Sequence, residues 1–284
     1  MRPGDVVVDI GTGTGLLAYF ACQAGASRVF AIEEGPVIEL AREIAELNGF
    51  TDRVEFFEEH STRVELPEPA DVLISETLWN FGAGEGLVGV LADARERLLK
   101  PGAPIIPAAV DLYVAPVQAD ATYALLAARP PDRHGIDLSP VRRYQVNSVQ
   151  MPHLHSDDFL GPPALLISTQ LADATEPDFE ADARTTVTTN GLLHGICGWF
   201  RAQLSPGVVL HNEPPSVKSS WAHALFPLPR PVAVRPGDDV TMHIQSAADG
   251  TIWRWRTEVH RGGRIMGAFD QSSTGGFPRA TAGA

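Results

Sequence analysis

Short apolar runs alternate with amphipathic stretches through the first hundred residues. The apolar runs predict strands at residues 6–10, 28–32, 54–57 and 71–75. Apolar residues at helical spacing predict intervening helices at residues 16–24, 36–48 and 87–99. Strands separated by helices indicate an α/β fold with a doubly wound parallel sheet.

The pattern changes after about Pro107. Proline and glycine separate shorter strand-like runs, at residues 110–117, 164–171, 195–204, 240–245 and 251–259. Runs of this kind are typical of an all-β sandwich or barrel. We therefore predict a doubly wound domain over residues 1–107, an all-β, barrel-like domain over 108–270 and a flexible tail over 271–284.

The composition limits the kinds of partner that we expect for this chain. The 284 residues carry a formal net charge of −13 without a basic run, which argues against a nucleic-acid partner. The charge fits either a cationic substrate or plain solubility. Cys22 and Cys197 are isolated, so we expect neither a disulfide framework nor a metal site. Without a signal peptide or an apolar run near the roughly 20 residues of a membrane span, we expect a cytoplasmic protein with no membrane contact.

A glycine loop joins the first strand to the first helix. It has the spacing D-x-G-x-G-x-G and contains Asp9, Gly11, Thr12, Gly13 and Gly15. Glycines there let the backbone turn tightly and approach a ligand at a helix N-terminus. A carboxylate directly before the glycines repels a pyrophosphate but suits a cationic or hydroxylated ligand. The loop thus favours S-adenosylmethionine (SAM) over a dinucleotide, whose loop has the spacing G-x-G-x-x-G.

Further cofactor contacts are expected after the second and third strands. Glu33, at the end of the second strand, is placed to accept both hydroxyls of a ribose. His60 and Ser61 follow the third strand, where an adenine edge would lie. Solvated loop residues are an equal alternative for these two positions.

Two glutamates lie nine residues apart in the stretch S-E-T-L-W-N-F-G-A-G-E, which follows the fourth strand. Glu76 points out of the carboxyl edge of the sheet, and a glycine-bearing loop can return Glu85 to face it. Two close anions suit a guanidinium, a planar cation with several N–H donors. The alternatives are an exposed strand-end carboxylate for Glu76 and a helix N-terminal charge for Glu85. Trp79, between them, either walls the cation site or simply packs.

These motifs resemble those of the protein arginine methyltransferase family. The resemblance rests on V-V-D-I-G-T-G-T-G-L-L from residue 7, V-E-L-P from residue 64, the double-glutamate loop, L-K-P-G from residue 99, G-I-D-L from residue 135, and S-W with F-P-L from residues 220 and 226. It covers most of the chain. The SAM motif is shared by many methyltransferases, so the double-glutamate loop and the β segments carry the specificity.

The resemblance implies a Rossmann-like SAM-binding domain followed by a β-barrel substrate domain with a dimerisation arm near residues 118–138. It implies that Glu33 holds the SAM ribose and that Glu76 and Glu85 clamp a guanidinium. The substrate would be arginine in a protein or peptide, or free arginine or another small guanidine. Trp221 would border the substrate pocket, and the enzyme would be a homodimer.

Two departures from the family keep alternatives open. The sequence begins almost at the first strand, without the helices that fold over SAM in the family, and the family's Thr-His-Trp loop is Ser219-Ser220-Trp221 here. We expect either a subfamily with an open cofactor site or an internal start at Met1. The alternatives in function are a non-catalytic, lid-less scaffold protein and a methyltransferase for another small-molecule acceptor. A carboxylate acceptor is disfavoured because two glutamates would repel it.

Overall fold

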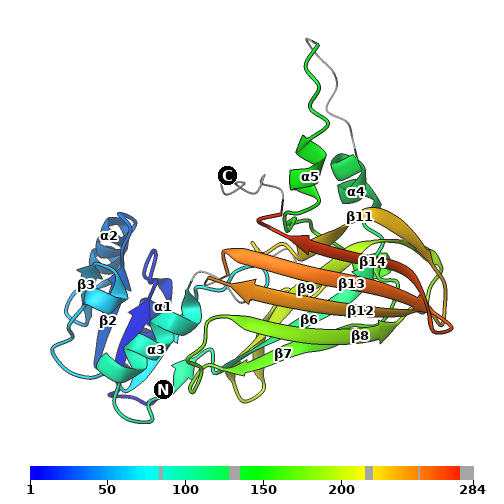
Figure 1. Ribbon diagram of the computed structural model, residues 1–284. Coiled ribbons are helices and arrows are strands. Elements are labelled where there is room, and N and C mark those ends of the chain that lie inside the picture. The colour runs from blue at the N-terminus through cyan, green and yellow to red at the C-terminus, as the bar shows by residue number, and fades with distance from the viewer. Residues whose placement is uncertain (83–85, 128–134, 215–219, 249, 276–284) are drawn as a thin grey trace, which may run out of the picture.

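The computed structural model describes residues 1–82, 86–127, 135–214, 220–248 and 250–275. Within these residues a parallel sheet with its helices comes first, and two antiparallel sheets follow (Figure 1). We call these parts the parallel domain and the β domain. The predicted order, α/β and then all-β, is confirmed.

In the described part of the chain, the strands of the parallel domain hydrogen-bond in the order β3-β2-β1-β4-β5. Their bounds are β1 (Val6–Ile10), β2 (Arg28–Glu33), β3 (Val54–Glu58), β4 (Val72–Ser75) and β5 (Ile105–Ile106). The central strand β1 is buried along its whole length, as expected where both faces of a sheet are covered. The chain crosses from edge strand β3 back to β4 beside β1, and such a change of direction opens a crevice at the carboxyl ends of the strands.

Helices cover both faces of this sheet. Their bounds are α1 (Leu16–Gln23), α2 (Ile38–Asn48), α3 (Leu87–Arg97) and the short 3-10 helix η1 (Ser61–Arg63). Helices α1 and α2 contribute Ala18 and Ala45 to a core with Val7 and Val29 of the sheet. Because side chains alternate along a strand, the opposite face of the sheet packs into a different core. That core contains Leu91 of α3 and continues into the β domain.

The β domain contains two antiparallel sheets within the described residues. In one, the order is β10-β9-β6-β7, and β11 also pairs with the long strand β9. Its strands are β6 (Ala109–Val117), β7 (Ala164–Gln170), β9 (Gly191–Ser205), β10 (Val208–His211) and β11 (Ala224–Val234). In the other the order is β14-β13-β12-β8. Its strands are β8 (Phe179–Thr186), β12 (Asp239–Ala247), β13 (Ile252–Arg261) and β14 (Arg264–Ser272).

One hydrophobic core connects these sheets. Trp253 and Trp255 alternate along β13 and are both buried. Phe226 of β11 contacts both rings edge-on, at centroid distances of 5.7 and 5.6 Å. The same core includes Leu73 of β4, so the two domains are joined by continuous apolar packing.

Two helices project from one end of the β domain (Figure 1). They are α4 (Asp120–Ala127), within the expected arm, and α5 (Val141–Gln145); the 3-10 helix η2 (Ser156–Asp158) precedes β7. At the other end of the sequence, β14 continues past the expected start of the tail at residue 271. There Gln271 is buried and accepts a hydrogen bond from the indole of Trp255 (3.1 Å). None of the described helices combines the length and apolar character needed to cross a bilayer.

Candidate active site

Three strand ends meet at the carboxyl edge of the parallel sheet. The last residue of β1 is in register with Ile32 of β2 and with Ser75 of β4. The residues that follow, Gly11, Glu33 and Glu76, are therefore neighbours at this edge. The sequence predicted each of them separately as part of a site.

A cleft of about 430 Å³ opens at this edge, within the usual range for small-molecule sites. Its lining residues are Ile10, Gly11, Ile32, Glu33, Glu34, Glu59, His60, Ser61, Thr77 and Val90. Among these described residues there are glutamates but no lysine or arginine. The cleft therefore suits a ligand that carries positive charge and lacks phosphate.

The glycine loop forms one side of the site. Gly11, Gly13 and Gly15 all have positive φ angles (73°, 55° and 83°), which glycine adopts without the steric cost that a side chain brings. The backbone N–H groups of Gly11 and Thr12 both donate to the carbonyl of Ile32 (2.9 and 3.0 Å). These bonds hold the loop against the end of β2.

Asp9 lies beneath this loop and is fully buried. Its Oδ2 accepts a hydrogen bond from the Thr12 hydroxyl (2.6 Å). Burial raises the pKa of Asp9 to about 6, against the lowering effect of the Thr12 bond. Asp9 and Thr12 therefore brace the loop from below.

Glu33 lies in the cleft, where its carboxylate is held by backbone groups. Oε2 accepts from the Gly13 N–H (3.1 Å) and Oε1 from the Gly35 N–H (2.8 Å). Because each carboxylate oxygen has a second lone pair, both can also accept a ligand hydroxyl. The carboxylate is thus oriented before any ligand arrives.

His60 and Ser61 also line the cleft, at the start of η1. His60 Nδ1 is 2.7 Å from the Thr62 hydroxyl. The Ser61 carbonyl accepts a hydrogen bond from the Arg97 guanidinium (2.9 Å), which ties η1 to α3. Both predicted residues line the same cleft as Glu33.

We expect Gly15→Ala to destabilise the fold by about 2–4 kcal/mol, because it combines backbone strain with a steric clash. A Cβ at Gly15 would overlap the Tyr19 hydroxyl, and φ is +83°. Gly49→Ala is the matched control, since φ is +69° there but nothing lies within 4 Å of the added Cβ. Urea unfolding at neutral pH measures both. Equal losses for the two variants would contradict the steric argument.

Glu76 follows β4 directly and is exposed. Its Oε1 accepts a hydrogen bond from the backbone N–H of Leu78 (3.3 Å). The next residue, Thr77, lines the cleft, and a Cβ at Gly11 would meet its methyl carbon at 2.7 Å. Glu76 therefore lies beside the cleft, on a loop that packs against the glycine loop. Glu85 lies outside the described residues.

The two predicted pocket tryptophans are connected with the loop of residues 76–82, which we call the β4 loop. Trp79 belongs to it and stacks on Trp253 (5.5 Å between centroids, 26° between planes). Trp221 donates a hydrogen bond from its indole N–H to the Leu78 carbonyl (3.0 Å). Its ring meets Phe200 edge-on at 5.6 Å.

Sequence analysis missed two asparagines at this junction. Asn80 of the β4 loop and Asn212, after β10, are joined by a hydrogen bond from Asn212 Nδ2 to the Asn80 carbonyl (2.8 Å). The residues are far apart in the sequence, and neither belongs to a recognisable motif. No signal in the sequence could have paired them.

His223, two residues after Trp221, belongs to the interior of the β domain. It is buried, and its Nδ1 accepts a hydrogen bond from the Leu154 N–H (2.9 Å). Burial lowers the pKa of His223 to about 4. This neutral histidine holds the segment before β7 and has no part in the cleft.

The pKa of His223 predicts a pH-dependent loss of stability. The imidazole stays neutral in the folded chain between pH 6.5 and 4, whereas the unfolded chain takes up a proton, so stability falls as the pH drops through this window. From pH 7 to pH 5 the contribution is about 2 kcal/mol. His223→Asn keeps an acceptor for the Leu154 N–H and removes the titration. Urea unfolding at both pH values should show a smaller loss for the variant; parallel losses would refute the assignment.

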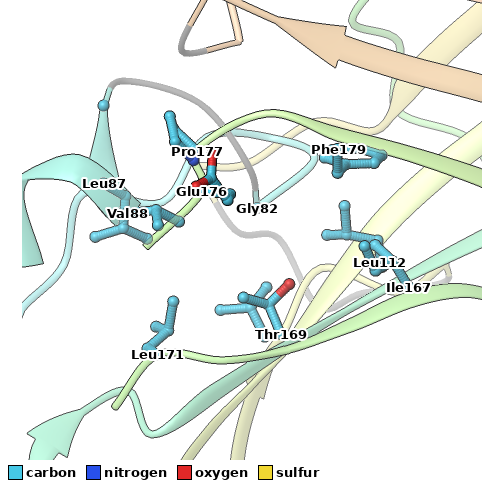
Figure 2. A pocket seen from close by; sticks show the side chains of 12 residues that line it. Gly82, Leu87, Val88, Leu112, Ile167, Thr169, Leu171, Glu176, Pro177 and Phe179 are labelled. Carbon is cyan, nitrogen blue, oxygen red and sulfur yellow. The ribbon is translucent and has the colours of Figure 1, made fainter. Parts of the chain in front are cut away.

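A second, much smaller cavity lies between the start of α3 and the β domain. Its volume is about 50 Å³, and Figure 2 shows Leu87 and Val88 of α3 facing Leu112, Ile167 and Phe179 across it. It has room for little more than a water molecule. It belongs to the packing between the domains and cannot hold a cofactor.

Family comparisons define the class of protein first. Residues 1–107 match the family of ribosomal protein L11 methyltransferase (PrmA), so the parallel domain is of the methyltransferase type. Residues 108–255 match the arginine methyltransferase oligomerization subdomain. Together the two matches follow the two domains of the structure.

Relatives that match most of the chain identify its family. Arginine N(omega)-methyltransferase of Streptomyces achromogenes subsp. streptozoticus is 32% identical over 252 residues, which cover 85% of this chain and 68% of that protein. Protein arginine N-methyltransferase 6 of Xenopus laevis is 29% identical over 254 residues, covering 85% and 74%. The chain belongs to the protein arginine methyltransferase family.

Solved structures show the same fold. The Trypanosoma brucei PRMT1 enzyme-prozyme heterotetrameric complex with AdoHcy has a TM-score of 0.86 and 24% identity, over 95% of this chain and 89% of that chain. Protein arginine methyltransferase 10 of Arabidopsis thaliana has a TM-score of 0.81 and 23% identity, over the same shares of both chains. The fold of both domains is therefore shared with these two structures.

Proposed function

We propose that this protein transfers a methyl group from SAM to a guanidino nitrogen of arginine, in a protein or peptide or as the free amino acid or a similar small guanidine. The observation that carries the proposal is a phosphate-repelling, glutamate-lined cleft with Glu76 beside it. Family membership and relatives named for arginine N-methylation support the same reaction.

The cleft fits SAM by its chemistry. Glu33 has free lone pairs for the ribose hydroxyls, the glycine loop passes under the methionine moiety, and His60 and Ser61 border the adenine edge. The acidic lining suits the sulfonium and ammonium charges of SAM. When bound, SAM supplies an electrophilic methyl group on sulfur.

The substrate side relies on carboxylates. A guanidinium arrives protonated and is a poor nucleophile because its lone pairs are delocalised. Glu76, with Glu85 as its partner, draws the positive charge toward the far nitrogens and leaves the near nitrogen better able to attack. Their main contribution is alignment for an in-line displacement. Either glutamate can accept the proton that the product loses.

The β domain completes the substrate side. We assign residues 1–107 to the cofactor and residues 108–270 to the substrate, with Trp79 and Trp221 bordering the guanidinium pocket. Trp79 belongs to the β4 loop and Trp221 donates a hydrogen bond to it, which supports this assignment. We also place the protein in the cytoplasm, as its isolated cysteines favour.

We also propose a homodimer formed through the arm of residues 118–138. The match to an oligomerization subdomain supports this assembly. The described part of the arm exposes Leu125 (73%) and Ile136 (58%), while α1 exposes Leu16 and Phe20 (55% and 52%). These exposed apolar side chains are the groups that we expect a second copy of the chain to cover. Sedimentation of the wild type and of Leu125→Asp should show a dimer and a monomer, respectively.

A panel of acceptors tests the reaction. With labelled SAM, we expect methyl transfer to free arginine or to an arginine-rich peptide and none to the same peptide with lysine in place of arginine. Calorimetry run in parallel reports SAM binding. Binding without transfer to any guanidine would support the scaffold alternative, and transfer to a carboxylate or hydroxyl acceptor would replace the proposed substrate.

A further inference from the structure

The β4 loop receives hydrogen bonds from a distant part of the β domain. Asn212 Nδ2 donates to the Asn80 carbonyl (2.8 Å), and the Ala222 N–H donates to Asn80 Oδ1 (2.7 Å). The Trp221 indole donates to the Leu78 carbonyl (3.0 Å). The loop that follows Glu76 is therefore fixed at two positions by residues of the β domain.

Asn212 is the centre of this network. It is fully buried, and its Oδ1 accepts from the Phe200 N–H of β9 (2.9 Å). Its Nδ2 donates to the carbonyls of both Asn80 and Ala222 (2.8 and 2.7 Å). A flipped amide would set its oxygen against two carbonyls and its NH₂ against an N–H, so only one orientation satisfies every group.

Apolar packing also holds the loop. Phe81 is fully buried and meets the rings of Phe226 and Trp253 at 5.4 and 5.8 Å. A Cβ at Gly198 of β9 would lie 2.5 Å from the Phe81 ring, so glycine there makes room for it. The backbone between Leu78 and Phe81 thus has little freedom to shift while Asn212 stays in place.

This anchoring extends to Glu76. Its Oε1 accepts from the N–H of Leu78, the residue whose carbonyl binds Trp221. We propose that Asn212 is a positioning residue, which holds the β4 loop so that Glu76 meets the substrate at the angle the reaction needs. The proposal rests on the proposed function. Its role is indirect, because the Asn212 amide binds Phe200, Asn80 and Ala222, and Asn212 is not among the residues that line the cleft.

Loss of the Asn212 side chain should affect SAM binding and the rate of the chemical step differently. The cleft is built by the parallel domain, whereas Asn212 lies in the β domain, so Asn212→Ala should leave the SAM dissociation constant within about threefold. Because alignment errors of about 1 Å cost about a hundredfold in rate, we expect kcat to fall about 10- to 100-fold. A loss of general stability alone would not lower kcat at a temperature where the variant remains folded.

Two further variants sharpen the test. Asn147→Ala is the matched control, since Asn147 also makes side-chain bonds within the β domain, to Arg143 and Ser272, but does not touch the β4 loop. It should keep the wild-type kcat. Asn80→Ala removes the acceptor for the Ala222 N–H at a half-buried position but keeps the carbonyl that binds Asn212, and should lower kcat about 3- to 10-fold.

The experiment measures kcat, KM and SAM affinity for the wild type and these variants, with hydrogen exchange of the peptide that covers residues 76–82. The proposal predicts a lower kcat, unchanged SAM affinity and faster exchange in Asn212→Ala and Asn80→Ala, but not in Asn147→Ala. Wild-type kcat in both loop variants would overturn it. If Asn212→Ala does not fold, the kcat and the hydrogen exchange of Asn80→Ala test the proposal. If the wild type methylates no guanidine, the proposed function fails by itself, and unchanged exchange in the variants would then refute the positioning role independently.

Discussion

Replacing Glu76 with glutamine should lower the rate of methyl transfer about 10²- to 10³-fold, or about 3–4 kcal/mol in transition-state stabilisation. In the proposed mechanism, the carboxylate at the end of β4 orients the guanidinium and draws its positive charge away from the attacking nitrogen. Glutamine keeps the size and one acceptor oxygen but removes that charge. SAM binding should persist, since the cleft residues are unchanged. Steady-state kinetics and calorimetry measure the two effects separately.

Glu58→Gln is the matched control for this prediction. Glu58 is also an exposed carboxylate at the end of a strand of the same sheet, but it does not line the cleft. It should keep wild-type kinetics. Unchanged turnover in Glu76→Gln would remove Glu76 from the mechanism and leave it as an ordinary strand-end carboxylate.

Replacing Glu33 with alanine should weaken SAM binding about a hundredfold, or about 3 kcal/mol, because the two charge-assisted hydrogen bonds that we propose between Glu33 and the ribose would be lost. The preorganised carboxylate also holds the N–H groups of Gly13 and Gly35 (3.1 and 2.8 Å), so the glycine loop loses a support at the same time. Titration calorimetry with SAM measures the loss.

Glu46→Ala serves as the control for Glu33. Glu46 is exposed on α2 and lies outside the cleft lining, so removing it changes the net charge equally without touching the ligand. Equal SAM affinity in the two variants would show that the ribose is not bound by Glu33.

Several residues that the sequence predicted for the cofactor lie together in the structure, for a physical reason. In a parallel sheet the carboxyl ends of adjacent strands meet at one edge, so residues that follow separate apolar runs become neighbours. Gly11 and Glu33 follow this rule, and His60 and Ser61 join them after β3, whereas Thr77 of the same cleft was not predicted. Local pattern and topology are sufficient here, because each contributing segment is short and adjoins a strand.

The proposed substrate side depends on contacts that no local pattern encodes. Trp79 stacks on Trp253, and Asn80 binds Asn212, in both cases between the two domains. Sequence analysis could offer only packing or a cation–π contact for Trp79. Tertiary packing determines that one face of its ring lies against Trp253.

Strand β11 shows another limit of pattern analysis. It contains Pro227, Pro229 and Pro231, which lack the N–H that a ladder requires and so argue against a strand. The structure accommodates them through a shift in register between Pro227 and Val232 opposite β9. The neighbours on β9, rather than the sequence of β11, allow this arrangement.

The central claim is that the cleft and Glu76 together direct a methyl group to a guanidino nitrogen. The most direct test incubates the wild-type protein with SAM labelled in its methyl group and with free arginine or an arginine-rich peptide, and locates the label by fragmentation mass spectrometry. The account predicts label on a guanidino nitrogen, formed together with an equal amount of S-adenosylhomocysteine. Label on any other atom, or no transfer by a protein that demonstrably binds SAM, would contradict it.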